Sequence, residues 1–196
     1  MIVRRIALSL MLIVCLGATG VAEARVRSSE LAVGGGLLIG PGIDLNGGPT
    51  ALKLNFRGWL TAMERDQLEL GLVLPFGLGF SGRSQGNVDI STTLFELAPS
   101  ARVLVALNEY VRPYFDFGPG FSVASTETVV RIFNLESHDT DSRTSILLRI
   151  AVGVEILPLR KQGLVLMVEP VAMNLRFFGG ATQAEYGLLF GAGYQL

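Results

Sequence analysis

The sequence has few of the residues on which redox and metal chemistry usually depend. Its 196 residues include one cysteine, one histidine and one tryptophan. The cysteine, Cys15, lies inside the first apolar run, so a chain that has lost this run forms no internal disulfide and offers no thiolate to a metal. We therefore expect no redox chemistry, no cofactor and no metal site in the mature protein.

The sequence also has no large excess of positive or negative charge. Sixteen lysines and arginines face 17 aspartates and glutamates, for a formal charge of −1. This balance gives no electrostatic support for a nucleic-acid partner. Hydrophobic residues make up 49% of the chain and the mean hydropathy is +0.47, which is high for a water-soluble protein. Part of the chain is therefore expected to contact lipid.

The first 24 residues predict a cleaved signal peptide. Arg4 and Arg5 form its positive region, residues 6–17 its apolar region, and the small residues ending at Ala24 its cleavage site. Weaker alternatives are a lipoprotein acylated at Cys15 and an uncleaved anchor helix. We expect cleavage after Ala24.

Long uncharged runs are absent from the rest of the chain. No stretch after residue 24 reaches the roughly 18 uncharged residues of a transmembrane helix. Residues 25–196 instead alternate apolar and polar side chains over short segments, the period of a β-strand whose two faces contact different media. The clearest stripe, in residues 67–80, consists of Leu68, Leu70, Leu72, Leu74, Phe76, Leu78 and Phe80.

Eight such segments predict an all-β fold, an eight-stranded antiparallel up-and-down transmembrane β-barrel that forms one domain. An even number of strands closes the sheet with both termini at one rim and leaves no unpaired edge in lipid. The predicted strands are residues 29–40, 50–60, 67–80, 92–106, 111–124, 144–157, 164–176 and 184–196.

The connections alternate in length, as in outer-membrane barrels with long external loops and short periplasmic turns. The predicted long loops are residues 41–49, 81–91, 125–143 and 177–183, and the predicted turns are residues 61–66, 107–110 and 158–163. Both termini are then expected in the periplasm.

The polar face is predicted to point inward. Glycines concentrate on it, where a narrow barrel has little interior room, and both signs of charge occur in nearly equal number, so that they can neutralise each other. The predicted lumen network comprises Lys53, Arg57, Glu69, Glu96, Arg102, Arg112, Asp116, Arg149, Glu155, Glu169 and Glu185. Its pairing core is predicted to be Glu96, Arg102, Arg149 and Glu155.

Five prolines and the seventh segment fit this pattern less well. Pro75, Pro99, Pro113, Pro119 and Pro170 fall within or at the start of strands, and each removes a ladder donor, so bulges or strand ends must accommodate them. In the seventh segment, alternation from Glu169 places Val171 and Met173 in the lumen and Asn174 outside. A register shift near Val171 is therefore expected.

The mature chain resembles the small outer-membrane β-barrels that include the OmpA transmembrane domain, OmpX and OmpW. The likeness rests on residues 186–196, which alternate to the last residue, and on residues 111–121, where glycines and aromatics alternate. Gly191, Tyr194 and Leu196 are similar to the C-terminal signal of such proteins. The resemblance implies assembly by the barrel-assembly machinery, although this chain ends in Leu rather than Phe and has Leu189 where the family usually has a polar residue.

Three functions remain open at this point. A structural or surface-interaction role for an integral outer-membrane protein, surrounded by lipid and lipopolysaccharide, is the leading hypothesis. A small channel for ions or apolar solutes is the first alternative. The second is a lipid A deacylase-like enzyme that uses Ser137 and His138, but these residues lie in the longest predicted loop, where a catalytic geometry is hard to maintain. We therefore expect no enzyme activity.

Overall fold

The computed structural model describes residues 32–46, 50–65, 68–132, 135–159 and 162–196, so the expected signal peptide lies outside the described residues. This part of the chain is almost entirely strand, and it contains no helix long and apolar enough to cross a membrane. The strands are β1 (Ala32–Asp44), β2 (Ala51–Arg65), β3 (Leu68–Gln85), β4 (Val88–Leu97), β5 (Ser100–Val105), β6 (Val111–Ile132), β7 (Leu135–Leu159), β8 (Leu164–Phe178) and β9 (Ala181–Gln195).

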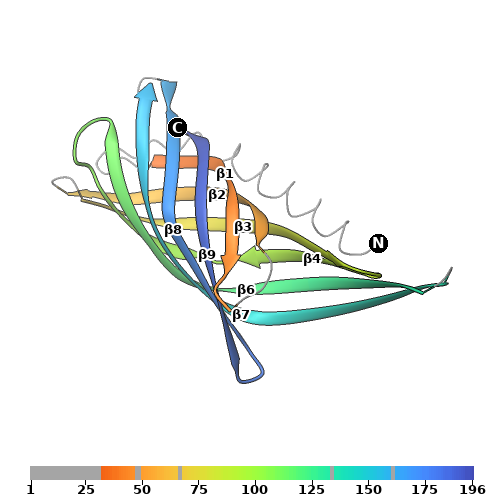
Figure 1. Cartoon of the computed structure of the whole chain (residues 1–196). Helices are drawn as coiled ribbons and strands as arrows, with labels where there is room; N and C mark the ends of the chain where they lie inside the picture. Colours follow the sequence, from red (N-terminus) through yellow and green to blue (C-terminus); the bar gives the residue numbers. More distant parts are fainter. Residues whose placement is uncertain (1–31, 47–49, 66–67, 133–134, 160–161) are drawn as a thin grey trace.

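These strands form a closed antiparallel ring with eight positions (Figure 1). Consecutive strands pair with each other except for β4 and β5, and β1 pairs with β9 to close the ring. β4 and β5 share one position, because both pair with β3 on one side and with β6 on the other. The break between them contains Pro99, which has no backbone N–H to donate. The predicted eight-stranded barrel is confirmed.

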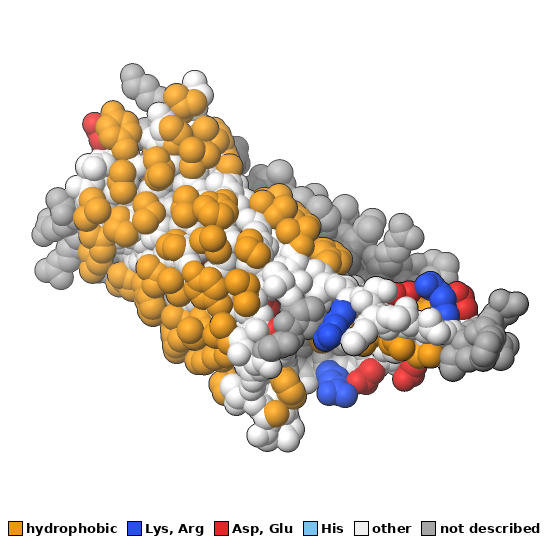
Figure 2. Space-filling view, in the orientation of Figure 1, with side chains coloured by type: hydrophobic (Ala, Val, Ile, Leu, Met, Phe, Trp, Pro, Cys, Tyr) orange, Lys and Arg blue, Asp and Glu red, His pale blue; other side chains and the backbone are white. Residues whose placement is uncertain are grey.

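Burial in this barrel is the inverse of burial in a water-soluble one. On the outer face Leu72 is 63% exposed and Phe117 is 46% exposed, whereas inside the ring Arg57 is 3% exposed and Glu169 is 0% exposed. Figure 2 shows apolar side chains spread over the barrel wall. The apolar stripe of β7 runs over residues 146–156, which matches the roughly 9–11 residues that a tilted strand needs to cross the hydrocarbon. The barrel wall is therefore built to contact lipid.

Four strands continue past the barrel as a flat extension, which we call the projecting sheet. It consists of residues 81–85 of β3, 88–93 of β4, 125–132 of β6 and 135–145 of β7. β2 stops pairing with β3 at Leu52, and β8 pairs with β7 only from Ile146 onward, so both sides of the projecting sheet are edges in the described residues. Figure 1 shows this sheet pointing away from the end of the barrel that carries the C-terminus.

The projecting sheet corrects two sequence predictions. Residues 81–91 and 125–143 were expected to be loops. In the first segment β3 extends to Gln85 and β4 begins at Val88. In the second, β6 extends to Ile132 and β7 begins at Leu135. The polar composition suggested a loop, yet residues 125–143 also contain three threonines and two valines, which favour strands. The loops at 41–49 and 177–183 are likewise shorter than expected, as is the turn at 61–66.

β8 contains the expected register shift. Its pairing with β9 changes between Glu169 and Ala172, on either side of Pro170. The shift turns Asn174 into the lumen, where it is 3% exposed, so the prediction from simple alternation that Asn174 lies outside was wrong. The Pro170 carbonyl, which leaves the ladder at this point, accepts a hydrogen bond from the Tyr186 hydroxyl. A carbonyl facing hydrocarbon needs such an internal partner.

Replacing Tyr186 with phenylalanine is expected to lower the free energy of unfolding by about 1–3 kcal/mol, because the Pro170 carbonyl is left without its partner. Urea unfolding in lipid vesicles measures the change. Tyr110→Phe, at the exposed turn before β6, is the matched control and should leave the midpoint unchanged. Equal midpoints for wild type and Tyr186→Phe would contradict the role of this hydrogen bond.

Candidate functional site

The lumen holds a closed ring of four charged side chains. Lys53 Nζ lies 2.6 Å from a Glu96 carboxylate oxygen and also contacts Glu185. Arg176 Nη2 contacts the same two carboxylates, at 2.6 Å from Glu96 and 2.5 Å from Glu185. Two cations and two anions make the ring neutral. Asn174 adds hydrogen bonds from Nδ2 to Glu96, at 3.1 and 3.2 Å.

A second network crosses the lumen as a chain in which cations and anions alternate. Arg57 Nη2 lies 2.8 Å from Glu169, and Arg102 contacts both Asp116, at 2.7 Å, and Glu155, at 2.6 Å. Four arginines and four carboxylates make this chain neutral as well. In order, its members are Arg149, Glu169, Arg57, Asp116, Arg102, Glu155, Arg112 and Glu69.

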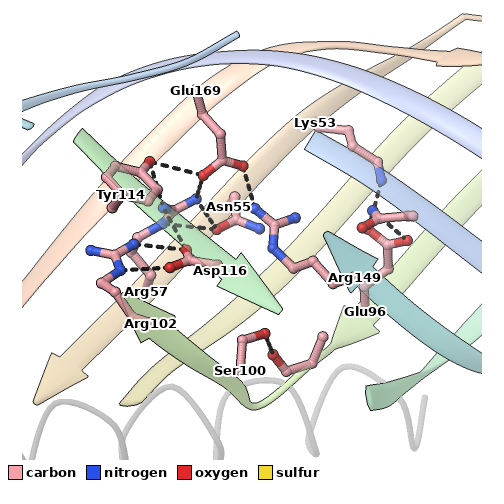
Figure 3. A network of polar contacts seen from close by, with 12 residues as sticks. Lys53, Asn55, Arg57, Glu96, Ser100, Arg102, Tyr114, Asp116, Arg149 and Glu169 are labelled. Carbon is pink, nitrogen blue, oxygen red and sulfur yellow. Dashed lines mark hydrogen bonds and ion pairs between the residues drawn. The ribbon is translucent and has the colours of Figure 1, made fainter. Parts of the chain in front are cut away.

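Tyr114 ties the middle of this chain together (Figure 3). Its hydroxyl donates to Glu169 at 3.0 Å and accepts from Arg57 Nη1 at 3.2 Å. The Arg102 guanidinium lies 4.0 Å from the centre of the Tyr114 ring, within the range of a cation–π contact. Charges buried at this depth are tolerated only when they are paired and hydrogen-bonded, and here nearly every polar atom has a partner.

An apolar cluster fills the lumen at the end near the C-terminus. Trp59 belongs to it together with Leu157, Val165 and Met167, all at most 7% exposed. The indole occupies the space above Gly34, where a Cβ atom would overlap its ring. The glycine therefore leaves room for the tryptophan, and the cluster seals this part of the barrel.

All eleven residues of the predicted lumen network lie inside the ring and take part in these ion pairs. Sequence reasoning missed Arg176, Asn174 and Tyr114. Arg176 and Asn174 were missed because the register shift in β8 moves every later residue of the strand to the opposite face of the sheet. Tyr114 could have been found, because it alternates with Arg112 and Asp116 on one strand face.

Arg149→Met is expected to lower the unfolding free energy by about 1.5–3 kcal/mol, the usual range for a hydrogen bond to a charged group. Glu169 keeps Arg57 and Tyr114 as partners, so the barrel should still fold. The measurement is the temperature at which the compact, heat-modifiable form disappears in detergent gels. An unchanged transition would count against the ion-paired lumen.

The projecting sheet carries a second, exposed set of charges. Arg131 lies 2.9 Å from Glu136 and 2.8 Å from Asp89, so that one arginine bridges β4, β6 and β7. Its hydrogen bond to Glu136 and the nearby Asp89 raise the pKa of Arg131. His138 lies 3.4 Å from Glu127 and 3.7 Å from Glu136. Ser137 is its neighbour on a paired strand and therefore points to the opposite face.

The three residues of the expected C-terminal signal lie at the end of β9. Tyr194 is 54% exposed and Leu196 is 66% exposed on the outer wall. Gly191 faces inward against the backbone of Leu37, where a side chain has no space. The side chain of Gln195, which lies between Tyr194 and Leu196 in the sequence, accepts a hydrogen bond from Arg112 at 2.6 Å. This contact ties the last strand to the lumen network.

The lumen contains a small cavity lined by Arg149 and Asn174, and its volume of about 10 Å³ is close to the minimum for one water molecule. Within the described ranges, no cluster of three or more His, Cys, Asp or Glu side chains is arranged to hold a metal ion. The candidate functional site is the projecting sheet, because residues 135–145 of β7 pair with β6 on one side and have no strand on the other within the described residues.

A closed ring with an apolar wall and a paired, charged interior is the construction of a transmembrane β-barrel. No protein-family model matches the sequence, and the curated proteins contain no significant match. Solved structures do match, and several of them are bacterial outer-membrane proteins. This chain therefore has the fold of the small outer-membrane β-barrels.

Three of these structures illustrate the likeness. Ail, the attachment invasion locus protein of Yersinia pestis, has a TM-score of 0.55 at 16% identity, over 87% of this chain and 100% of Ail. A major outer membrane protein from Thermus thermophilus has a TM-score of 0.53 at 17% identity, over 84% and 99%. The Escherichia coli outer membrane protease OmpT has a TM-score of 0.52 at 8% identity, over 87% and 98%. At these identities the shared property is the fold.

Proposed function

We propose that this protein is a non-conducting outer-membrane barrel that holds the projecting sheet above the cell surface and binds a partner there. The observation that carries the proposal is the open edge of β7, where residues 135–145 pair with β6 on one side and lie beyond the reach of β8 on the other. A strand edge presents unpaired N–H and C=O groups that can accept a further strand.

The packed lumen supports the non-conducting part of the proposal. Both charge networks are neutral and buried, and the Trp59 cluster fills the barrel near the C-terminus. An ion path requires mobile water along the whole axis. Planar-bilayer recordings of the purified protein are therefore expected to show no steady unitary currents. Steady currents would favour the alternative, a small channel for ions or apolar solutes.

Charge indicates what kind of partner fits the edge. The projecting sheet contains three arginines and five carboxylates, a formal charge of −2 with His138 neutral. On β7 itself Glu136, Asp139 and Asp141 outnumber Arg143. We infer that the partner is an extended segment rich in lysine or arginine. Pairing of two β7 edges from separate copies is disfavoured, because antiparallel alignment about Thr140 places Asp139 opposite Asp141.

The same charge distinguishes this sheet from a binding site for sulfated polysaccharide. Ail has been solved in complex with the heparin analogue sucrose octasulfate, and that structure matches this chain with a TM-score of 0.52 at 16% identity. A polyanion placed at the acidic β7 edge would be repelled. Heparin is therefore the informative negative control in a binding test.

We also propose that the protein is not an enzyme. A nucleophile and its base must lie within hydrogen-bond reach of each other, whereas Ser137 and His138 point to opposite faces of β7. The His138 ring is instead flanked by Glu127 and Glu136. Loss of acyl chains from lipid A that depends on Ser137 and His138 would overturn this part of the proposal.

The test of the surface role uses the purified barrel in nanodiscs and synthetic peptides. An alternating Lys-Val peptide is expected to bind, with an affinity that falls as salt rises. A Glu-Val peptide of equal length and heparin are expected not to bind. Heparin binding without Lys-Val binding would contradict the proposal.

Variants locate the binding to the edge. Reversing both charges with Asp139→Lys and Asp141→Lys should abolish peptide binding. Gln85→Lys combined with Ser91→Lys is the control, because it adds two lysines at exposed positions of β3 and β4, away from the β7 edge. If this control weakens binding as strongly as the β7 double variant, the contact is a diffuse charge effect rather than strand addition.

Assembly and surroundings complete the proposal. Tyr194 and Leu196, exposed at the end of the last strand, are proposed to be read by the barrel-assembly machinery together with Gly191. Lipid surrounds the apolar wall, and lipopolysaccharide is the expected neighbour at the base of the projecting sheet.

A further inference from the structure

Three buried side-chain atoms of the lumen have no hydrogen-bond partner within the described protein: Nε of Arg112, Nε of Arg149 and Oδ1 of Asn174. The last two belong to side chains that are each 3% exposed. Leaving a buried donor or acceptor unpaired is unfavourable, because the group has given up its hydrogen bonds to water and gained none in return. The other ends of these two side chains are engaged, Arg149 Nη2 with Glu169 and Asn174 Nδ2 with Glu96. Arg149 Nε and Asn174 Oδ1 therefore need an explanation.

Arg149 and Asn174 line the same small cavity. Its wall combines polar side chains, among them Lys53, Asn55 and Glu96, with apolar ones such as Leu54 and Leu189. Its volume of about 10 Å³ is close to the minimum that holds one water molecule. A buried water usually makes two to four hydrogen bonds. Here an unpaired donor and an unpaired acceptor belong to two residues that line one cavity of the right size.

We propose that this cavity binds one structural water, which accepts from Arg149 Nε and donates to Asn174 Oδ1. This water would also connect the two charge networks. Asn174 belongs to the neutral ring of four, through Glu96, whereas Arg149 ends the chain of eight, through Glu169. The water joins the two networks into one that extends across the lumen.

Charge favours water over an ion at this place. The ring holds two cations and two anions, and the chain holds four of each, so both networks are already neutral. A chloride or a metal ion would add an uncompensated charge to a buried site, which is far more costly than a neutral dipole.

A high-resolution crystal structure of the wild-type protein tests the proposal. The expected result is a density peak about 2.7–3.2 Å from both Arg149 Nε and Asn174 Oδ1. Three results would overturn it: no peak while both atoms stay unpaired, a rotated side chain that lets the two residues bond directly, or an anomalous signal at the site after a bromide soak.

Gly187→Ala provides the matched variant, because Gly187 lines the cavity and an added Cβ comes no closer than 3.3 Å to other atoms. The peak should disappear in this variant and persist in Gly35→Ala, whose new methyl group would have 3.6 Å to its nearest neighbour. Should Gly187→Ala fail to fold, NMR of the wild-type protein tests the proposal by measuring magnetisation transfer from water to the side-chain amide of Asn174. Transfer from a long-lived bound water would support the proposal, and the absence of such transfer would contradict it.

Discussion

Replacing Glu169 with glutamine is expected to lower the free energy of unfolding by about 3–5 kcal/mol, the cost of breaking a buried ion pair by removing one partner. Glu169 is 0% exposed and receives Arg57, Arg149 and the Tyr114 hydroxyl. Without its charge, two guanidinium groups remain buried with too few anions. Because the chain of eight is neutral only as a whole, no neighbouring carboxylate can compensate.

Glu136→Gln is the control for this experiment, since it makes the same chemical change in an exposed ion pair. Glu136 contacts Arg131 on the projecting sheet, where both side chains are more than half exposed. Water screens such pairs, so the unfolding transition should not move. Unfolding in lipid vesicles compares the two variants. Similar destabilisation by both would contradict the assignment of Glu169 to a buried core.

Leu74→Arg is expected to destabilise the membrane-inserted barrel by about 2–4 kcal/mol, the cost of a charged side chain on the lipid face near the bilayer midplane. Leu74 lies at the centre of the apolar stripe of β3 and is 43% exposed. On a water-soluble barrel the same substitution would cost almost nothing, or would improve solubility. The sign of the change therefore separates the two kinds of barrel.

The matched control is Thr140→Arg, an exposed position of β7 on the projecting sheet. It introduces the same side chain on the same barrel, beyond the apolar wall, and should leave stability unchanged. Unfolding measured in vesicles gives both values under one condition. Equal effects of the two substitutions would contradict a lipid boundary between Leu74 and Thr140.

Much of this fold could be predicted because alternation is a local property. A stripe such as Leu68 to Phe80 reports the environment of its two faces without knowledge of any partner strand, and eight stripes define the closed ring. The inward direction followed from the glycines, since Gly34 leaves space for Trp59. These features depend on residue type and spacing alone.

The remainder depends on pairing, which the sequence does not display. The register shift after Glu169 is set by Pro170 and by the hydrogen bond from Tyr186, and it decides that Asn174 and Arg176 face inward. Residues 125–143, the outer part of the β6–β7 hairpin, were expected to be a loop because they are mostly polar. Its strands are held together by the backbone pairing of β6 and β7, which continues without a break to Ile132 and Leu135.

Quenching of tryptophan fluorescence by brominated lipid tests most directly which side of the wall faces hydrocarbon. The chain has a single tryptophan, Trp59, which points into the lumen and is 5% exposed. We expect little quenching of the wild-type protein and strong quenching of a Trp59→Phe, Leu74→Trp variant. Strong quenching of Trp59, together with water-like emission from the indole introduced at position 74, would contradict the account.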